Sequence, residues 1–279
     1  MLVHKTVKLF IGGKFPRTES GRSFPEYHNG SKEIYANVCH GSRKDFRNSV
    51  EAATKAESGW AKATAFNRGQ ILYRMAEMTE GKRLEFVDLF KKVLGKSDAE
   101  ANAEVDAAID AFVYYAGFTD KYQHLVGTVN PVSGPYMNYT QPEHMGVTVL
   151  ICDDKFDFQK LVIDLCGIIG AGNTAVVLLA AECHSVLAPL AEVFATSDLP
   201  AGVVNLLSGH LEELAVHMAG HMEVKAVSYQ HSDSKYLTMM RKEGADNMKR
   251  VIRKRAKNLT IEPLTDHLEY KTVWHPLGL

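Results

Sequence analysis

Four short runs of aliphatic and β-branched residues decide the fold of this chain. Residues 147–151 have the sequence VTVLI, residues 175–179 AVVLL, residues 203–207 VVNLL and residues 224–229 VKAVSY. Each run precedes a segment in which apolar residues have helical spacing, at 158–169, 185–196, 212–219 and 234–242. Strands that alternate with helices in this way form a parallel sheet with helices on both faces. The sequence therefore predicts an α/β fold built on a doubly wound, Rossmann-like parallel sheet.

The chain before these repeats has a different pattern. Residues 9–38 contain apolar runs broken by glycines and polar turns, which predicts one or two antiparallel hairpins at the N-terminus. Ser42 and Asp45 have the spacing of a helix-capping pair. Apolar periodicity predicts three helices after the hairpins, at residues 42–60, 67–94 and 98–124.

Residues 125–145 separate these helices from the repeats. Three prolines interrupt this segment, and its alternating residues 136–139 (YMNY) predict a short strand. A further strand-like segment, residues 270–274 (YKTVW), follows the last repeat and is expected to pair outside the parallel sheet. We therefore predict one discontinuous domain and one β arm, formed respectively by residues 1–126 with 146–262 and by residues 127–145 with 263–279.

Composition excludes several classes of protein. The 279 residues are 46% hydrophobic and 23% charged, which is ordinary for a globular chain, and the net charge of −1 gives no global attraction to nucleic acid or anionic membranes. Asp164 and three glycines interrupt the long apolar stretch at residues 161–181, so it does not predict a membrane span. Four widely spaced cysteines and an N-terminus without a secretory signal predict a cytoplasmic protein with reduced thiols.

Few residues indicate chemistry on their own. Cys152 follows the first predicted strand, where a nucleophilic thiol is conceivable, but a cysteine of the core or its rim is the simpler interpretation. His217 and His221 have the i, i+4 spacing of metal ligands, but the glutamate of an H-E-x-x-H motif is missing and no metal is expected. Residues 167–172 (GIIGAG) are glycine-rich, yet they follow a predicted helix and are better explained as its end than as a nucleotide-binding loop.

Basic residues are concentrated between Arg241 and Lys257. A solvated face or an edge strand is one interpretation, and a phosphate-binding patch is the other. No aromatic residue lies among them to stack on a base, so the first interpretation is favoured and nucleic acid is not an expected partner.

Longer segments resemble one known family. They are Gly95-Lys96, residues 104–117 (EVDAAIDAFVYYAG), residues 171–174 (AGNT) and residues 199–205 (LPAGVVN). In order and spacing they are similar to the NAD-binding domain of the aldehyde dehydrogenase superfamily, over about residues 9–236. The resemblance implies a Rossmann-like NAD domain and, for an intact member, NAD(P)-dependent oxidation of aldehydes.

The positions to which the resemblance assigns the reaction have changed. The family's oxyanion-stabilising asparagine, within a proline-tryptophan-asparagine-phenylalanine-proline run, corresponds to Lys155 in residues 153–157 (DDKFD). The family's general-base glutamate corresponds to Lys254. The resemblance thus implies that neither catalytic group is present.

The cofactor positions have changed as well. A lysine that contacts the ribose in the family corresponds to Leu178, which cannot donate a hydrogen bond, while Glu182 lies one residue beyond the family's glutamate. The pyrophosphate turn corresponds to residues 231–236 (HSDSKY), which keep Ser232 but lack both glycines of the family's G-S-x-x-x-G. Cys152, Lys155, Leu178, Glu182 and Ser232 are therefore expected to form a vestigial pocket, and no NAD(P) is expected in it.

The resemblance also concerns the end of the chain. The family's catalytic domain, with its nucleophilic cysteine, is expected to occupy roughly two hundred further residues, so we expect that domain to be absent here. Residues 268–274 instead resemble the family's C-terminal oligomerisation strand, and residues 132–141 its matching hairpin. The same combination is similar to the degenerate second half of the tandem aldehyde dehydrogenases called family 16.

These features favour a non-catalytic, oligomerising or regulatory subunit. It would form a homo-oligomer or bind a full-length aldehyde dehydrogenase through residues 132–141 and 268–279, with no membrane partner. The alternative is an NAD(P)-binding oxidoreductase of the same family with an altered cofactor pocket, in which Cys152, Glu182 and Ser232 are the remaining polar groups.

Overall fold

The centre of the protein is a parallel sheet. The structure, a computed structural model, describes residues 4–253 and 258–278. The sheet has the order β10-β9-β6-β7-β8. Its strands are β6 (Val147–Ile151), β7 (Thr174–Leu178), β8 (Val204–Leu207), β9 (Val224–Tyr229) and β10 (Arg250–Ile252). The chain runs outward from β6 to β8 and then crosses to the other side of β6, which confirms the predicted doubly wound α/β fold.

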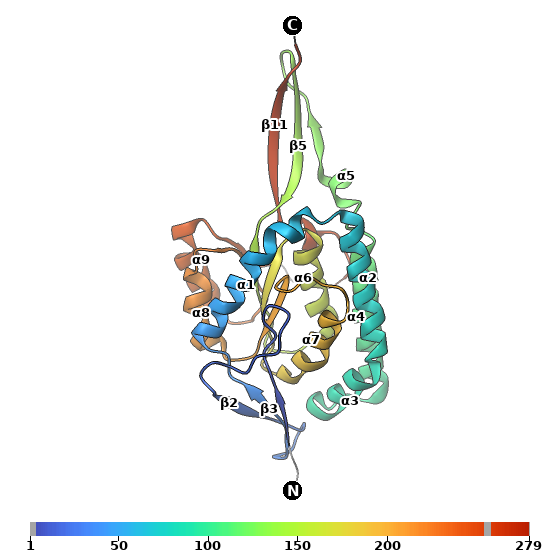
Figure 1. Cartoon of the computed structure of the whole chain (residues 1–279), viewed down its shortest axis with the longest axis vertical. Helices are drawn as coiled ribbons and strands as arrows, with labels where there is room; N and C mark the ends of the chain where they lie inside the picture. Colours follow the sequence, from blue (N-terminus) through green and yellow to red (C-terminus); the bar gives the residue numbers. More distant parts are fainter. Residues whose placement is uncertain (1–3, 254–257, 279) are drawn as a thin grey trace.

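Helices cover both faces of this sheet (Figure 1). One face carries α6 (Phe158–Gly170) and α7 (Leu187–Ala195), with α2 (Ala65–Gly81) and α4 (Asp98–Ala116) packed on them. The other face carries α1 (Arg43–Lys62), α8 (Leu211–Gly220) and α9 (Ser234–Gly244). Strand side chains alternate between the two apolar cores, with Leu150 and Val177 in the first and Val149 and Val176 in the second. Burial on both faces explains the continuous apolar runs in the sequence.

Shorter elements connect these layers. They are α3 (Arg83–Leu94), α5 (Tyr122–Val126), α10 (Glu262–Thr265) and the 3-10 turns η1 (His184–Val186) and η2 (Ala245–Asn247). No helix in residues 4–253 and 258–278 is long and apolar enough to cross a membrane.

The N-terminal strands form a separate small sheet. It comprises β1 (Lys5–Val7), β2 (Ser23–Tyr27) and β3 (Ile34–Cys39) in the order β1-β3-β2. β2 and β3 pair antiparallel as predicted, whereas β1 runs parallel to β3 and is not part of a hairpin with it. The cause is a detour after β1, where Phe10 pairs with Leu206 at the edge of the central sheet and Gly12 and Gly13 turn the chain with positive φ.

Two of the predicted helices end earlier than expected. The segment 67–94 is not one helix, because Lys82 leaves the helical path with φ −104° and ψ 11° and separates α2 from α3. The segment 98–124 ends its first helix at Ala116, and α5 forms separately. The predicted cap of α1 is confirmed, since Ser42 Oγ accepts a hydrogen bond from Asp45 N and the Asp45 carboxylate accepts one from Ser42 N.

A narrow β arm projects from the body (Figure 1). Its strands are β4 (Thr128–Asn130), β5 (Tyr136–His144) and β11 (Leu268–Pro276), in the order β11-β5-β4. β5 is longer than the predicted strand at 136–139, because β11 pairs with it antiparallel along its whole length, from Leu268 opposite His144 to Pro276 opposite Tyr136.

Candidate functional site

A groove lies at the carboxyl edge of the parallel sheet. The loops after β6, β7, β8 and β9 converge there, because parallel strands end at the same edge. They enclose a cavity of about 230 Å³. Its lining comes from Ile151, Cys152 and Asp153 after β6, residues 178–181 after β7, residues 209–212 after β8, and His231 and Tyr236 after β9.

The wall formed by β7 is apolar. Leu178, Leu179 and Ala180 are buried, and none of their side chains can form a hydrogen bond. Leu178 thus lines the groove as the sequence predicted, but as a hydrophobic surface.

The turn that leads into α9 is bound by a carboxylate. Asp154 forms an ion pair with His231 Nε2 and accepts a hydrogen bond from Ser232 Oγ. Asp233 caps the first turn of α9, where its carboxylate accepts from Lys235 N at 2.7 Å. The N-terminus of this helix therefore already has two carboxylates beside it, which is the arrangement that its dipole favours.

Glu182 is committed to the backbone of the opposite loop. Its carboxylate accepts a hydrogen bond from Phe156 N at 2.7 Å, which ties the loop after β7 to the loop after β6. Phe156 is buried and packs against Phe90, with ring centroids 5.4 Å apart. Lys155, next to it, is exposed to solvent. The contact therefore holds the two loops together and leaves Lys155 on the surface.

A second, water-sized cavity of about 20 Å³ lies at the start of α6. Cys152, Lys155 and Asp164 line it, and Lys160 at its edge pairs with Asp153 at 3.1 Å. Burial raises the pKa of the Cys152 thiol, and the negative charge of Asp164 raises it further. Cys152 is therefore a protonated thiol at neutral pH and a poor nucleophile.

Burial also affects the carboxyl group of this small cavity. It raises the pKa of Asp164 to about 7, and the nearby Lys160 offsets part of that effect. Asp164 is thus poised to be partly protonated at neutral pH.

Histidines border the other end of the groove. The rings of His40, His184 and His210 surround Phe24, with centroids 5.7, 5.0 and 5.2 Å from it. Burial lowers the pKa of His184 to about 4, so its ring is neutral at neutral pH. Its Nε2 lies 3.3 Å from the carbonyl oxygen of Gly209, in the loop after β8. These rings are therefore packing groups of the groove wall.

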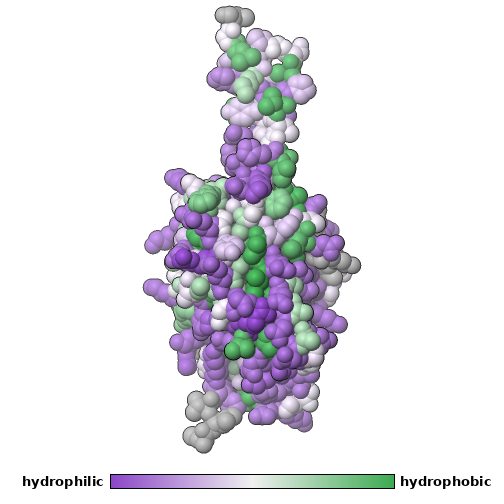
Figure 2. Space-filling model, turned by 90° about the vertical axis from the view of Figure 1, so that its right-hand side faces the viewer, coloured by the Kyte–Doolittle hydropathy of each residue, from purple (hydrophilic) through white to green (hydrophobic). Residues whose placement is uncertain are grey.

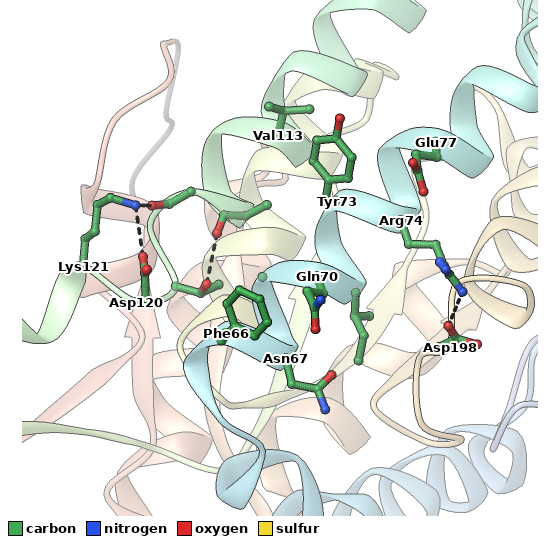
Figure 3. Close-up of a pocket in the computed structure, with 15 residues that line it drawn as sticks. Phe66, Asn67, Gln70, Tyr73, Arg74, Glu77, Val113, Asp120, Lys121 and Asp198 are labelled. Carbon is green, nitrogen blue, oxygen red and sulfur yellow. Dashed lines mark hydrogen bonds and ion pairs between the residues drawn. The ribbon is translucent and has the colours of Figure 1, made fainter.

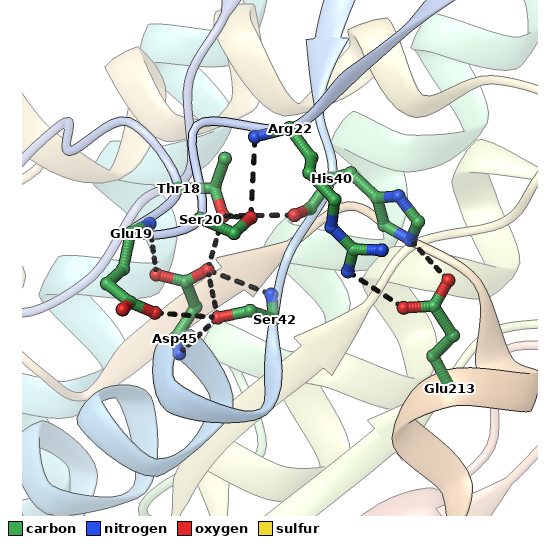
Figure 4. A network of polar contacts seen from close by, with 8 residues as sticks. All are labelled: Thr18, Glu19, Ser20, Arg22, His40, Ser42, Asp45 and Glu213. Carbon is green, nitrogen blue, oxygen red and sulfur yellow. Dashed lines mark hydrogen bonds and ion pairs between the residues drawn. The ribbon is translucent and has the colours of Figure 1, made fainter.

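A polar network fixes this histidine wall to the N-terminal sheet (Figure 4). Glu213 of α8 contacts Arg22 at 2.8 Å and His40 at 3.3 Å. In the same network the buried Asp45 accepts hydrogen bonds from Thr18 Oγ1 at 2.6 Å and from Ser42 N at 2.8 Å. The network therefore stabilises the position of α8 relative to the N-terminal sheet.

Several contacts in this groove lie where the resemblance places the cofactor. Asp154 and Asp233 place carboxylates at the turn 231–236, where the resemblance places the pyrophosphate and where phosphates need hydrogen-bond donors. Leu178 offers no donor to a ribose, and the carboxylate of Glu182 is already bound to Phe156 N.

Among the described residues, the other predicted positions do not line the groove. Lys254 lies outside the described residues. His217 and His221 lie at the end of α8, and within the described ranges no group of three or more His, Cys, Asp or Glu side chains could hold a metal ion.

Residues 167–172 end α6, as predicted. Within the basic segment, β10 is an edge strand, while Lys249 is buried and donates to the carbonyl oxygens of Ala219 and His221.

A wider cavity lies on another face, between α2 and α4 (Figure 3). It has a volume of about 670 Å³ and is bordered by Phe66, Tyr73 and Val113. Arg74 pairs with Asp198 at one side of it. None of the candidate site residues named from the sequence lines this cavity, although Val113, Ala116 and Gly117 of the segment 104–117 do.

Sequence reasoning missed the most informative pair in the groove. From the sequence, Asp154 was given no role and His231 was noted only as a replaced glycine. In the structure the side chains of Asp153 and Asp154 diverge, toward Lys160 and His231 respectively. The sequence offered one signal. A histidine replaces the first glycine of the family's motif in the turn 231–236, and aspartates replace family residues in the loop 153–157.

Comparisons with known proteins identify the family. Residues 15–255 match the aldehyde dehydrogenase family. The chain is 30% identical over 248 residues to "Aldehyde dehydrogenase, cytosolic 1" of Elephantulus edwardii, with 88% of this chain and 49% of that protein covered. It is 28% identical over 268 residues to "Aldehyde dehydrogenase family 2 member B4, mitochondrial" of Arabidopsis thaliana, with 95% and 47% covered.

The fold agrees with solved structures of the same family. The NAD⁺ complex of aldehyde dehydrogenase from Bacillus cereus superposes with a TM-score of 0.82 at 28% identity, covering 88% of this chain and 50% of that one. This chain spans about half the length of the curated relatives it matches. The sequence match and the superposition together establish that the chain belongs to the aldehyde dehydrogenase family.

Proposed function

We propose that this chain is a non-catalytic member of the family whose role is to assemble, through its β arm, with itself or with a complete aldehyde dehydrogenase. The observation that carries the proposal is the double contact of Asp154 with His231 and Ser232. It places a negative charge and three side chains where an intact member accommodates the pyrophosphate of its cofactor.

The remaining chemistry of the groove supports the same conclusion. Lys155, at the position of the oxyanion-stabilising asparagine, is exposed, and the nearby Cys152 is a protonated thiol. β10 ends at Ile252 and β11 begins at Leu268, so the sequence between these two strands is too short to contain a reaction domain.

The β arm supports an assembly role. Its three strands form a single layer, and no other described element covers either face near the tip. Figure 2 shows hydrophobic (green) surface near the tip of the arm. The large side chains exposed on the arm include Val129, Tyr136, Met137, Val273 and Trp274. Isolated sheets gain stability by burying an apolar face, so we infer that a partner covers this one.

Nucleotide binding is tested by isothermal titration of the purified chain with NAD⁺ and NADP⁺ at up to millimolar concentrations. The B. cereus enzyme, which has been crystallised with NAD⁺, serves as the positive control. We expect no heat of binding for this chain. Binding at millimolar affinity or tighter that Leu178→Arg abolishes would favour the alternative, an NAD(P)-binding oxidoreductase with an altered pocket.

Assembly is tested by native mass spectrometry of the chain purified from its own source. A variant that lacks residues 270–279 keeps the buried Leu268 and loses most of β11. We expect the intact chain to form an oligomer or a complex with a longer dehydrogenase, and the truncated variant to be monomeric. Unchanged assembly of the truncated variant would contradict an assembly role for the arm.

A further inference from the structure

The outer edge of β11 is open. In the order β11-β5-β4, β11 pairs only with β5, and its residues 269–276 are all exposed. The pairing with β5 continues over nine residues with no bulge. The opposite edge of the arm is β4, which has only three residues. A long, regular and unprotected edge is the kind that pairs with another strand.

The register identifies which backbone groups point outward. Leu277 N donates to Pro135 O at 2.8 Å, so the odd-numbered residues of β11 direct their N–H and C=O groups toward β5. Tyr270 lies opposite Pro142, which has no N–H, as expected for a position that does not bond to β5. The N–H and C=O groups of Tyr270, Thr272 and Trp274 therefore point to the open side.

The sequence of β11 is self-complementary about Thr272. If a second copy pairs antiparallel with Thr272 opposite its equivalent, all nine residues of both strands overlap. Tyr270 then faces the partner's Trp274, and the Glu269 carboxylate faces the partner's His275, whose ring can donate a hydrogen bond to it. Aromatic pairs are a favourable cross-strand combination.

Neighbouring registers are less favourable. The two-fold axis could also pass through Lys271 or Val273, because even-numbered residues, whose N–H and C=O groups point outward, would still face each other. A centre at Lys271 would place two lysines opposite each other, and a centre at Val273 would place Tyr270 opposite the partner's Pro276 and lose the aromatic pair. Like charges directly opposite are destabilising and aromatic pairs are stabilising, so the centre at Thr272 is selected.

We propose that two copies of this chain join by antiparallel pairing of their β11 edges about a two-fold axis at Thr272, so that one sheet runs through both arms. The proposal rests on the assembly role argued above and names a second copy as the partner. The hydrogen bonds come from Tyr270, Thr272 and Trp274 of each copy, and the pairing leaves every bond between β11 and β5 in place.

The first test uses two substitutions at the axis. Thr272→Pro removes the outward N–H without removing a bond to β5, whereas Thr272→Val keeps that N–H and removes only the hydroxyl that contacts Thr140 at 2.9 Å. Sedimentation equilibrium should show an apparent dissociation constant that rises at least about ten-fold for Thr272→Pro and stays near the original value for Thr272→Val. Circular dichroism verifies that both variants are folded.

A second test uses the wild-type chain and needs no proline substitution. Amide hydrogen exchange measured by NMR at low and high protein concentration should show protection of Tyr270, Thr272 and Trp274 that increases with concentration. The amide of Val273, which faces β5, should be protected at both concentrations. Mild oxidation should also cross-link two copies of Thr272→Cys but not two copies of Tyr270→Cys, whose thiols would lie several residues apart.

The outcomes separate this inference from the proposed function. An oligomer that persists in Thr272→Pro and depends on residues 270–279 would overturn the edge pairing and leave the assembly role standing. A complex only with a longer dehydrogenase would overturn the choice of a second copy. A wild-type monomer that binds NAD⁺ would overturn both.

Discussion

Asn173 Nδ2 donates a hydrogen bond to the carbonyl oxygen of His267 at 2.8 Å, across 94 residues of sequence. The other end of the same amide, Oδ1, accepts hydrogen bonds from Met145 N at 2.6 Å and Gly146 N at 2.9 Å. One buried side chain at the start of β7 thus binds the chain where it leaves β5 and where it enters β11. The AGNT segment at 171–174, which carried the family resemblance, has a structural role as the anchor of the arm.

Replacing Asn173 by alanine should therefore weaken the whole protein. The variant would leave the buried Met145 and Gly146 N–H groups and the His267 carbonyl without this partner, which costs about 3 kcal/mol in the free energy of unfolding. Urea denaturation followed by fluorescence measures the change. Asn67→Ala, at an exposed position, should change stability by less than about 0.5 kcal/mol. Equal effects of the two substitutions would contradict the anchoring role.

Gly167 of α6 is required by the close approach of α10. A Cβ atom at this position would lie 2.4 Å from the carbonyl oxygen of Pro263, whereas one at Gly170 would lie 3.6 Å from the nearest atom of Leu264. Gly167→Ala should lower the unfolding free energy by about 1–3 kcal/mol. Gly170→Ala should be neutral or raise it slightly, because alanine favours a helix. Thermal denaturation of the pair, one turn apart on the same helix, checks whether contact with α10 decides the difference.

Asp164 should make stability fall as pH rises. Its pKa is raised from 3.8 to about 7 in the folded state by burial, so its stabilisation is full below the unfolded pKa and is lost as pH rises through the folded one. Between about pH 4 and 7 this amounts to roughly 4 kcal/mol. Asp164→Asn should remove this fall, and the exposed Asp110→Asn should not. The measurement is the unfolding free energy in urea at several pH values, and an unchanged slope in Asp164→Asn would contradict the raised pKa.

Burial of His267 should make the unfolding free energy fall as the pH is lowered, which is opposite to the effect of Asp164. Burial lowers its pKa from 6.5 to about 4, and its Nδ1 lies 2.6 Å from the carbonyl oxygen of Pro263. A lowered pKa means that the stabilisation is present above the unfolded value and is lost as pH falls through the folded one. The loss between about pH 6.5 and 4 is roughly 3 kcal/mol. His267→Gln should be less sensitive to acid than the wild type, while the exposed His124→Gln should behave like it. The measurement is the difference in urea midpoint between pH 7 and pH 4.5. If the two variants are equally sensitive to acid, His267 is not the source of the acid sensitivity of the wild type.

Local sequence determined most of the elements of this protein. The run at 224–229 forms β9 with the predicted bounds, and Ser42 with Asp45 caps α1 as predicted. The physical reason is that strand periodicity and helix capping depend on residues within one turn or one run of the chain. The apolar character of Leu178 could likewise be deduced without coordinates, because a leucine cannot donate a hydrogen bond in any fold.

Only the tertiary structure decided how these elements meet. The parallel pairing of β1 with β3, the contact of Asp154 with Ser232 across 78 residues, and the anchoring of β11 by Asn173 all join segments with no local signal for each other. Such contacts depend on the order in which strands enter the sheet and on the direction in which loops return, and those are fixed by burial of the two apolar cores. The sequence therefore determined which residue types stand at the positions that the resemblance assigns to the cofactor, whereas the tertiary structure decided which side chains occupy the groove and which edge of the arm remains open.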